Sequence, residues 1–431
     1  MKMGTALCAV GMGLAIQAMA QTEPARAEPA APAAAAAPAD IERDLCAAVA
    51  EGAQLLRDNR LNPDGAAAKE ALLEALIRVS EPTAAFLSEA ELAARSERLS
   101  EREWDVGLTL TSVADGLPKV AAVRAESPAA AAGILPGEMI EKVADREILT
   151  GANLKMVRGL LAGGEAAALE IVVRGEDAQS RTVAVERVRR ADASLTDVEE
   201  LPAGMGYMRA AGIFVGAGGE IAATLEKWQA AGKLGAILDL RGADGTAEGE
   251  IPAVAARFAP FGETLYAMDD RQGREIAAVK AGPAPEASLP LMVLVDEETS
   301  GAAELLAAVL GGGVKGAMLI GRETAGDPMI REPKKLSTGR YALLATRQLK
   351  LPDGAVYAGA AGVQPDVVIT DSALDETVYE PDAPVLRKGK TMTDEEKDDK
   401  ALRDRTRNDT YLRRATDVLL GLKALGYGAQ R

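Results

Sequence analysis

The sequence predicts a multidomain α+β protein with N-terminal helices, a small β-rich domain and a larger α/β core. The chain has 431 residues, which exceeds the usual size of one domain. Residues 104–190 contain short alternating segments typical of strands, such as DVGLTL at 105–110. From 204 to 370, apolar runs such as AILDLRG at 236–242 alternate with helical segments, which indicates an α/β layer structure.

The first 39 residues resemble an export segment followed by a tether. Lys2, an apolar run over 4–16 and small residues before Gln21 predict a signal peptide over 1–20, cut after Ala20. The alternative is an ordinary apolar N-terminal helix. The run is too short to span a bilayer. We therefore expect an exported protein, periplasmic or extracellular, with no membrane span in the mature chain.

Residues 21–39 are rich in proline and alanine and predict an extended linker. Residues 40–103 predict a helical region, with apolar residues at helical spacing in LLEALIRV at 72–79. Ser88 and Glu91 have the spacing of a capping box that begins another helix. SEPTAAFL at 80–87 is expected to be a turn that carries an apolar plug.

The rest of the chain divides into three further segments. The α/β core is expected over 191–375, with a strand at 291–297 and a helix at 302–310. Residues 376–408 are highly charged and predict a loosely ordered linker. Residues 409–431 predict a final amphipathic helix.

Composition excludes several classes of function. The net charge of −16 argues against nucleic-acid binding and against attraction to anionic lipid. The chain has no histidine, which removes Ser-His-Asp and Cys-His catalysis and His-ligated metal sites. Loss of Cys8 with the signal peptide leaves Cys46, expected to be buried on a helix, so neither a disulfide nor a thiolate metal cage can form. We expect neither a metal nor another cofactor.

Six short motifs occur in a characteristic order along the chain. They are SEPTAAFL at 80–87, SPAAAAGILPGEMI at 127–140, LDLRGADGT at 238–246, LVDEETSGAAE at 294–304, IGRETAGDP at 320–328 and GVQPDVVI at 362–369. This collinear set resembles the carboxy-terminal processing peptidases, also called tail-specific proteases, of peptidase family S41. The resemblance implies that residues 104–190 form a PDZ-like domain and that 191–375 form the peptidase core.

The resemblance implies a serine–lysine mechanism, which agrees with the missing histidine. A serine at a helix N-terminus would attack the peptide carbonyl, and a lysine kept neutral by burial would act as the base. Backbone N–H groups, here of Gly245 and Ala302, would hold the developing oxyanion.

The catalytic positions themselves depart from the family pattern. Alignment on Glu304 places the nucleophile at Gly301, which has no hydroxyl. The base lysine falls on Asp327, and the supporting glutamine falls on Arg331. These three positions therefore predict a vestigial site.

A displaced catalytic pair is the alternative. Ser300 is the fallback nucleophile, although serine before a helix is commonly an N-cap. Lys334 is the fallback base, with Lys335 beside it, whereas Lys315 follows the far end of the helix that Ser300 begins. Thr299 and Thr324 supply further hydroxyls.

Two hypotheses of function follow. In the first, the protein is a catalytically inactive relative that binds polypeptide C-termini or regulates a partner, such as an active paralogue. The peptide would add as a strand at Val106, Gly107, Leu108 and Thr109, opposite the helix at 153–163. In the second, it is an active serine endopeptidase that cleaves unfolded or tagged polypeptides near their C-termini.

Overall fold

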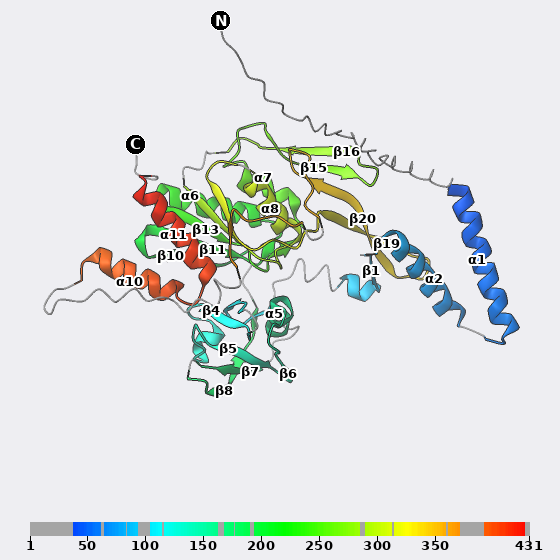
Figure 1. The fold of residues 1–431 in the computed structure, drawn as a ribbon, viewed down its shortest axis with the longest axis horizontal. Coiled ribbons are helices and arrows are strands. Elements are labelled where there is room, and N and C mark those ends of the chain that lie inside the picture. Colours follow the sequence, from blue (N-terminus) through cyan, green and yellow to red (C-terminus); the bar gives the residue numbers. More distant parts are fainter. Residues whose placement is uncertain are drawn as a thin grey trace, which may run out of the picture. The chain divides into compact units, whose positions relative to one another are not determined.

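The computed structural model places most of the chain (Figure 1). It describes residues 38–61, 64–82, 84–93, 104–113, 116–162, 168–175, 177–189, 194–284, 289–312, 314–358, 361–370 and 392–426. The predicted signal peptide, and the predicted linker up to residue 37, lie outside the described residues. The chain separates into two compact units, Met1–Ala68 and Lys69–Arg431.

The first unit is represented by helix α1 (Pro38–Asp58) and the start of α2 (Gly65–Ser80). Leu45, Val49 and Leu55 are exposed on α1. Cys46 is also exposed, so the expectation that it is buried was wrong. A single helix cannot cover its own apolar face, which explains the exposure.

The second unit is built around a six-stranded sheet. Its order is β10 (Leu195–Leu201), β11 (Met205–Ala210), β13 (Gly235–Asp239), β17 (Leu291–Val295), β18 (Ala317–Gly321) and β21 (Val367–Val368). Only the β10–β11 pair is antiparallel; the other pairs are parallel. This arrangement confirms the predicted α+β class.

Helices cover both faces of this sheet. They are α6 (Ala217–Ala230), α7 (Ile251–Ala255), α8 (Gly301–Gly311), α10 (Asp394–Thr406) and α11 (Thr410–Ala424), with short 3-10 turns at Pro202–Gly204 and Glu248–Glu250. Leu238 on β13 packs with α6, α7 and α8, whereas its neighbour Ile237 packs with α10 and α11. Strand alternation thus divides one apolar run between two cores.

A second, antiparallel sheet extends from the core. It contains β1 (Ala85–Leu87), β20 (Tyr341–Lys350), β15 (Thr264–Asp270), β16 (Glu275–Lys280) and β19 (Met329–Lys335). The segment 80–87 is therefore more than a turn, because β1 pairs with β20 in register. Sequence reasoning missed this strand because its partner lies more than 250 residues away. The predicted Ser88–Glu91 capping box is formed.

The β-rich module, residues 104–189, has its own core. Its main strands are β3 (Leu108–Thr111), β4 (Lys119–Val123), β5 (Met139–Val143), β7 (Ala168–Arg174) and β8 (Ser180–Glu186), in that order, with β6 (Arg146–Glu147) beside β5. A separate pair joins β2 (Trp104–Asp105) to β9 (Val188–Arg189). Helices α4 (Pro128–Ala131) and α5 (Leu154–Ala162) complete the module.

The charged segment 376–408 is not wholly a linker, because it contains α10. Thr393 and Glu396 form a capping box at its start. Acidic residues occupy its first turn and basic residues its last, which suits the helix dipole. Leu402 is buried against the central sheet, and this long-range contact was not visible in the local charge pattern. In the described part of the chain, no helix combines the length and apolarity needed to cross a membrane.

Candidate active site

The turn between β17 and α8, residues 296–300, is tied to the loop that follows β13. Asp296 Oδ1 accepts hydrogen bonds from Gly242 N at 2.8 Å and from Glu298 N at 3.2 Å. Thr299 Oγ1 donates to Leu240 O at 2.9 Å. The turn is therefore rigidly positioned, and the buried Thr299 hydroxyl serves this structural role.

Gly301, where the resemblance places the nucleophile, is the first residue of α8 and has φ +57°. A Cβ built there would lie 2.5 Å from Gly245 O. Gly245 sits on β14 (Asp244–Gly245), which pairs with β12 (Gly212–Ile213). A Cβ on Gly245 would in turn lie 2.3 Å from Ile213 O. The two glycines permit a close backbone approach that leaves no room for a side chain at 301.

Ser300 occupies the N-cap position of α8 with extended φ and ψ of −146° and 172°. Its N–H donates to Ala243 O at 2.9 Å. Its side chain makes no capping hydrogen bond. The N-cap position expected from the sequence is therefore correct, but the hydroxyl does not perform the capping. Ala302, the other expected oxyanion-binding residue, is buried in the first turn of the helix.

Asp327, at the position expected for the base, forms an ion pair with Arg331. Arg331 Nη1 lies 2.6 Å from Asp327 Oδ2. The structure thus brings together two of the three predicted vestigial residues. An ionised carboxylate held by a guanidinium cannot replace a neutral amine as the base.

The lysines considered as alternative bases are all exposed. Lys334 Nζ binds Glu332 Oε2 at 2.8 Å. The amine of Lys335 lies 5.4 Å from the centre of the Tyr341 ring. Lys315 is exposed beyond the end of α8. A lysine that acts as a base in this family is expected to be buried, and none of these three side chains is buried.

Glu304 joins α8 to the loop that carries Asp327. Its side chain is fully buried and accepts hydrogen bonds from Thr324 Oγ1, Gly326 N at 2.6 Å and Asp327 N at 3.1 Å. Burial raises the pKa of Glu304, and these hydrogen bonds counteract part of the effect. Sequence reasoning used Glu304 only to align the motif. The signal for a structural role was an acid within the apolar helix GAAELLAAVL.

A buried network of charged side chains holds the loop that follows β13. Arg241 binds Asp409 through two hydrogen bonds, both 2.8 Å, and its Nε binds Asp239 Oδ1 at 2.9 Å. Burial alone would raise the pKa of Asp239, but Arg209 and Arg241 outweigh it and hold that pKa well below its usual range. Asp409 also caps α11, since it accepts from Leu412 N at 3.1 Å. The C-terminal helix is thereby fastened to the candidate site, a contact the sequence did not predict.

Arg158 reaches the same region from the β-rich module. Its Nη1 lies 2.6 Å from Glu298 Oε2. A Cβ on Gly242 would lie only 1.7 Å from the same nitrogen, so the arginine passes directly over the loop. Burial lowers the pKa of Arg158, and Asp296 and Glu298 oppose this shift. Nothing in the local sequence marked Arg158, because its partners lie about 140 residues away.

The residues predicted to bind a peptide line one edge of the module. Val106 O accepts from Ala129 N, and Gly107 O accepts from Arg124 N, both at 2.9 Å. Gly107 has φ +86°, and a Cβ there would lie 2.2 Å from Ser127 Cβ. The loop before β3 is therefore held in one conformation. Leu108 and Thr109 begin β3 itself.

Comparison with known proteins identifies the class of the core. Residues 204–369 match the sequence profile of peptidase family S41. These residues form an S41 peptidase domain, which confirms the family predicted from the motifs.

Individual relatives are distant. The chain is 27% identical over 324 residues to the chloroplastic C-terminal processing peptidase of Tetradesmus obliquus, covering 71% of this chain and 68% of that one. It is 28% identical over 277 residues to chloroplastic carboxyl-terminal-processing peptidase 2 of Arabidopsis thaliana, covering 61% of this chain and 52% of the relative. A solved structure described as an S41 protease of Bacteroides fragilis aligns with a TM-score of 0.50 at 20% identity, covering 80% and 87% of the two chains. This last likeness concerns the fold alone.

Proposed function

We propose that the protein is a catalytically inactive member of the S41 family that binds polypeptide C-termini or regulates a partner such as an active paralogue. The observation that carries this proposal is the contact between Gly301 and Gly245. The position of the nucleophile lacks a hydroxyl, and the Gly245 carbonyl oxygen lies 2.5 Å from where its Cβ would be. The Asp327–Arg331 ion pair at the position of the base also favours an inactive site.

Binding would reside in the β-rich module, which we propose to be PDZ-like. Strand β3 is an edge strand of its sheet, so within the described residues it is paired on one side only, with β4. Helix α5 packs beside it. An edge strand beside a helix suits addition of an extended peptide, whose carboxylate would meet the loop at Val106–Gly107. The names of the two relatives, both C-terminal or carboxyl-terminal processing peptidases, are consistent with such a ligand.

Digestion of an unfolded protein with an apolar C-terminus tests this proposal. We expect no cleavage by the wild type or by Ser300→Ala. We also expect none from Gly301→Ser combined with Asp327→Lys, because the new side chain would meet the Gly245 carbonyl. The wild type should nevertheless bind a labelled peptide that carries the same apolar C-terminus, as measured by fluorescence anisotropy. Cleavage by the wild type would overturn the proposal.

One observation favours the alternative, an endopeptidase with a displaced nucleophile. The Ser300 hydroxyl is not used in capping α8, so it remains available for other contacts with a substrate. Cleavage that Ser300→Ala abolishes and Lys334→Ala reduces would establish this alternative. We further propose export to the periplasm or exterior, which mass spectrometry of the mature N-terminus would test by detecting Gln21 as the first residue.

A further inference from the structure

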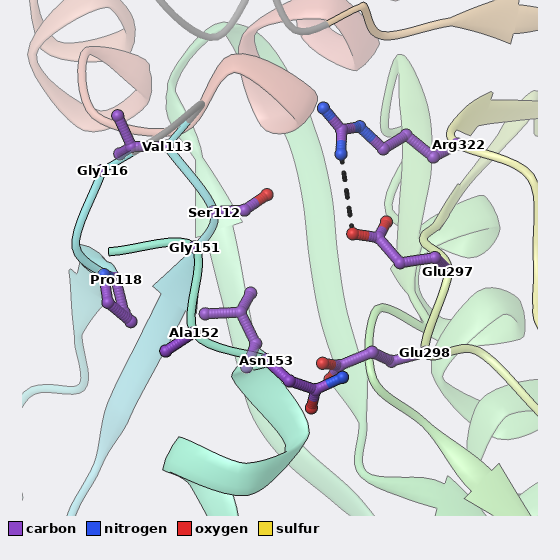
Figure 2. A pocket seen from close by; sticks show the side chains of 11 residues that line it. Ser112, Val113, Gly116, Pro118, Gly151, Ala152, Asn153, Glu297, Glu298 and Arg322 are labelled. Atoms are coloured by element: carbon purple, nitrogen blue, oxygen red, sulfur yellow. Dashed lines mark ion pairs between the residues drawn. The ribbon is translucent and has the colours of Figure 1, made fainter. Parts of the chain in front are cut away.

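A pocket of about 290 Å³ lies where the β-rich module meets the core. Figure 2 shows Ser112 and Asn153 of the module on one side and Glu297, Glu298 and Arg322 of the core on the other. The Ser112 hydroxyl points across the opening toward the core side chains (Figure 2). The pocket thus presents hydroxyl, amide and charged groups to whatever enters it.

The pocket lies at one end of the proposed peptide-binding edge. Strand β3 runs from Leu108 to Thr111 and leads directly to Ser112. Asn153 immediately precedes α5, and it caps that helix by accepting from Met156 N at 3.1 Å. A peptide pairing antiparallel with β3, its carboxylate at the Gly107 end, would extend toward this pocket. Because β3 has four residues, the side chain that arrives there lies about four positions before the C-terminus.

The charges of the pocket favour a basic side chain. Glu298 is already held by Arg158 at 2.6 Å. Glu297 is held only loosely, with Arg322 Nη1 at 3.5 Å, and 53% of its side chain is exposed. Its carboxylate can therefore accept a second cation without losing a close ion pair. The net charge of −16 also attracts basic ligands over longer range.

We propose that this pocket selects a lysine or arginine about four residues before the C-terminus of the bound polypeptide, with Glu297 as the acceptor. The inference rests on the proposed function, since it assumes that β3 binds an extended C-terminal segment. It adds a side-chain preference that the peptide backbone alone cannot supply.

Fluorescein-labelled decapeptides ending in Leu-Ala provide the test. Lysine, alanine or glutamate is placed in turn at each of the third to sixth positions from the C-terminus, and the Kd is measured by anisotropy with the full mature chain. We expect lysine to bind roughly threefold to fivefold more tightly than alanine at one of these positions, and glutamate more weakly than alanine. The advantage should shrink when salt is raised from about 0.05 M to about 0.5 M.

Two variants locate the effect. Glu297→Gln should abolish the lysine preference, so that lysine and alanine peptides bind this variant with equal affinity. Glu275→Gln is the matched control, because Glu275 is also 53% exposed and also lies 3.5 Å from its cation, Lys350, but belongs to β16. Equal affinities for lysine and alanine peptides at every position would refute the inference and leave peptide binding intact. Failure of every peptide to bind would refute the proposed binding of polypeptide C-termini together with the inference.

Discussion

Substitution of Gly301 by alanine is the most direct test of the closed site. Two effects should destabilise the variant. The backbone at 301 has φ +57°, where a residue with a Cβ costs roughly 1–2 kcal/mol. The new Cβ would also lie 2.5 Å from Gly245 O, and relief of that contact requires a backbone shift that costs about 1–3 kcal/mol.

Gly216→Ala provides a matched control. Gly216 also stands at the start of a core helix, as the N-cap of α6, and has φ +94°. A Cβ built there meets nothing within 4 Å. The free energy of unfolding of the control should therefore fall only by the cost of the backbone conformation, about 1–2 kcal/mol. That of Gly301→Ala should fall by about 2–5 kcal/mol in total.

Urea unfolding of the two variants and the wild type gives both values. Trp228 on α6 is buried in the same hydrophobic core as α8 and serves as a fluorescent reporter. Hydrogen exchange should additionally show faster exchange around 243–246 in Gly301→Ala alone. Equal losses of stability in the two variants would refute the reasoning, since they would mean that the Gly245 carbonyl does not fill the position of the side chain.

Three further predictions concern the supports of the site. Glu304→Gln should gain stability relative to wild type as pH rises. The raised pKa of Glu304 stabilises the wild type fully below the unfolded pKa of 4.5, and this stabilisation is lost as pH rises through the folded pKa. Urea unfolding at several pH values would contradict this if the stability difference between variant and wild type did not change with pH. Arg158→Ala should cost about 1–3 kcal/mol of stability and accelerate hydrogen exchange in the 296–300 turn. Arg181→Ala, which breaks an ion pair with Glu138 inside the module, should leave that turn unchanged. Asp409→Ala should lower the free energy of unfolding by about 3–5 kcal/mol, because it removes a buried partner of Arg241. Thr393→Ala, which removes an exposed helix cap, should lower it by about 1 kcal/mol. Similar losses in the two variants would contradict the importance of the buried network.

The sequence by itself determined the features that depend on residue identity and local order. The missing histidine excluded whole classes of catalysis. Alternating apolar runs gave the β-rich module and the α/β core because strand and helix periods are local properties. The collinear motifs led to the S41 family, and alignment on Glu304 placed glycine where a nucleophile was expected.

The tertiary structure decided how that position is surrounded. The approach of Gly245 to Gly301 depends on the pairing of β14 with β12, which joins segments about 30 residues apart. The roles of Glu304, Arg158 and Asp409 likewise arise from partners between 20 and 168 residues away. Such contacts leave no periodic signal in the sequence, because the folded backbone, and not local spacing, brings these groups together.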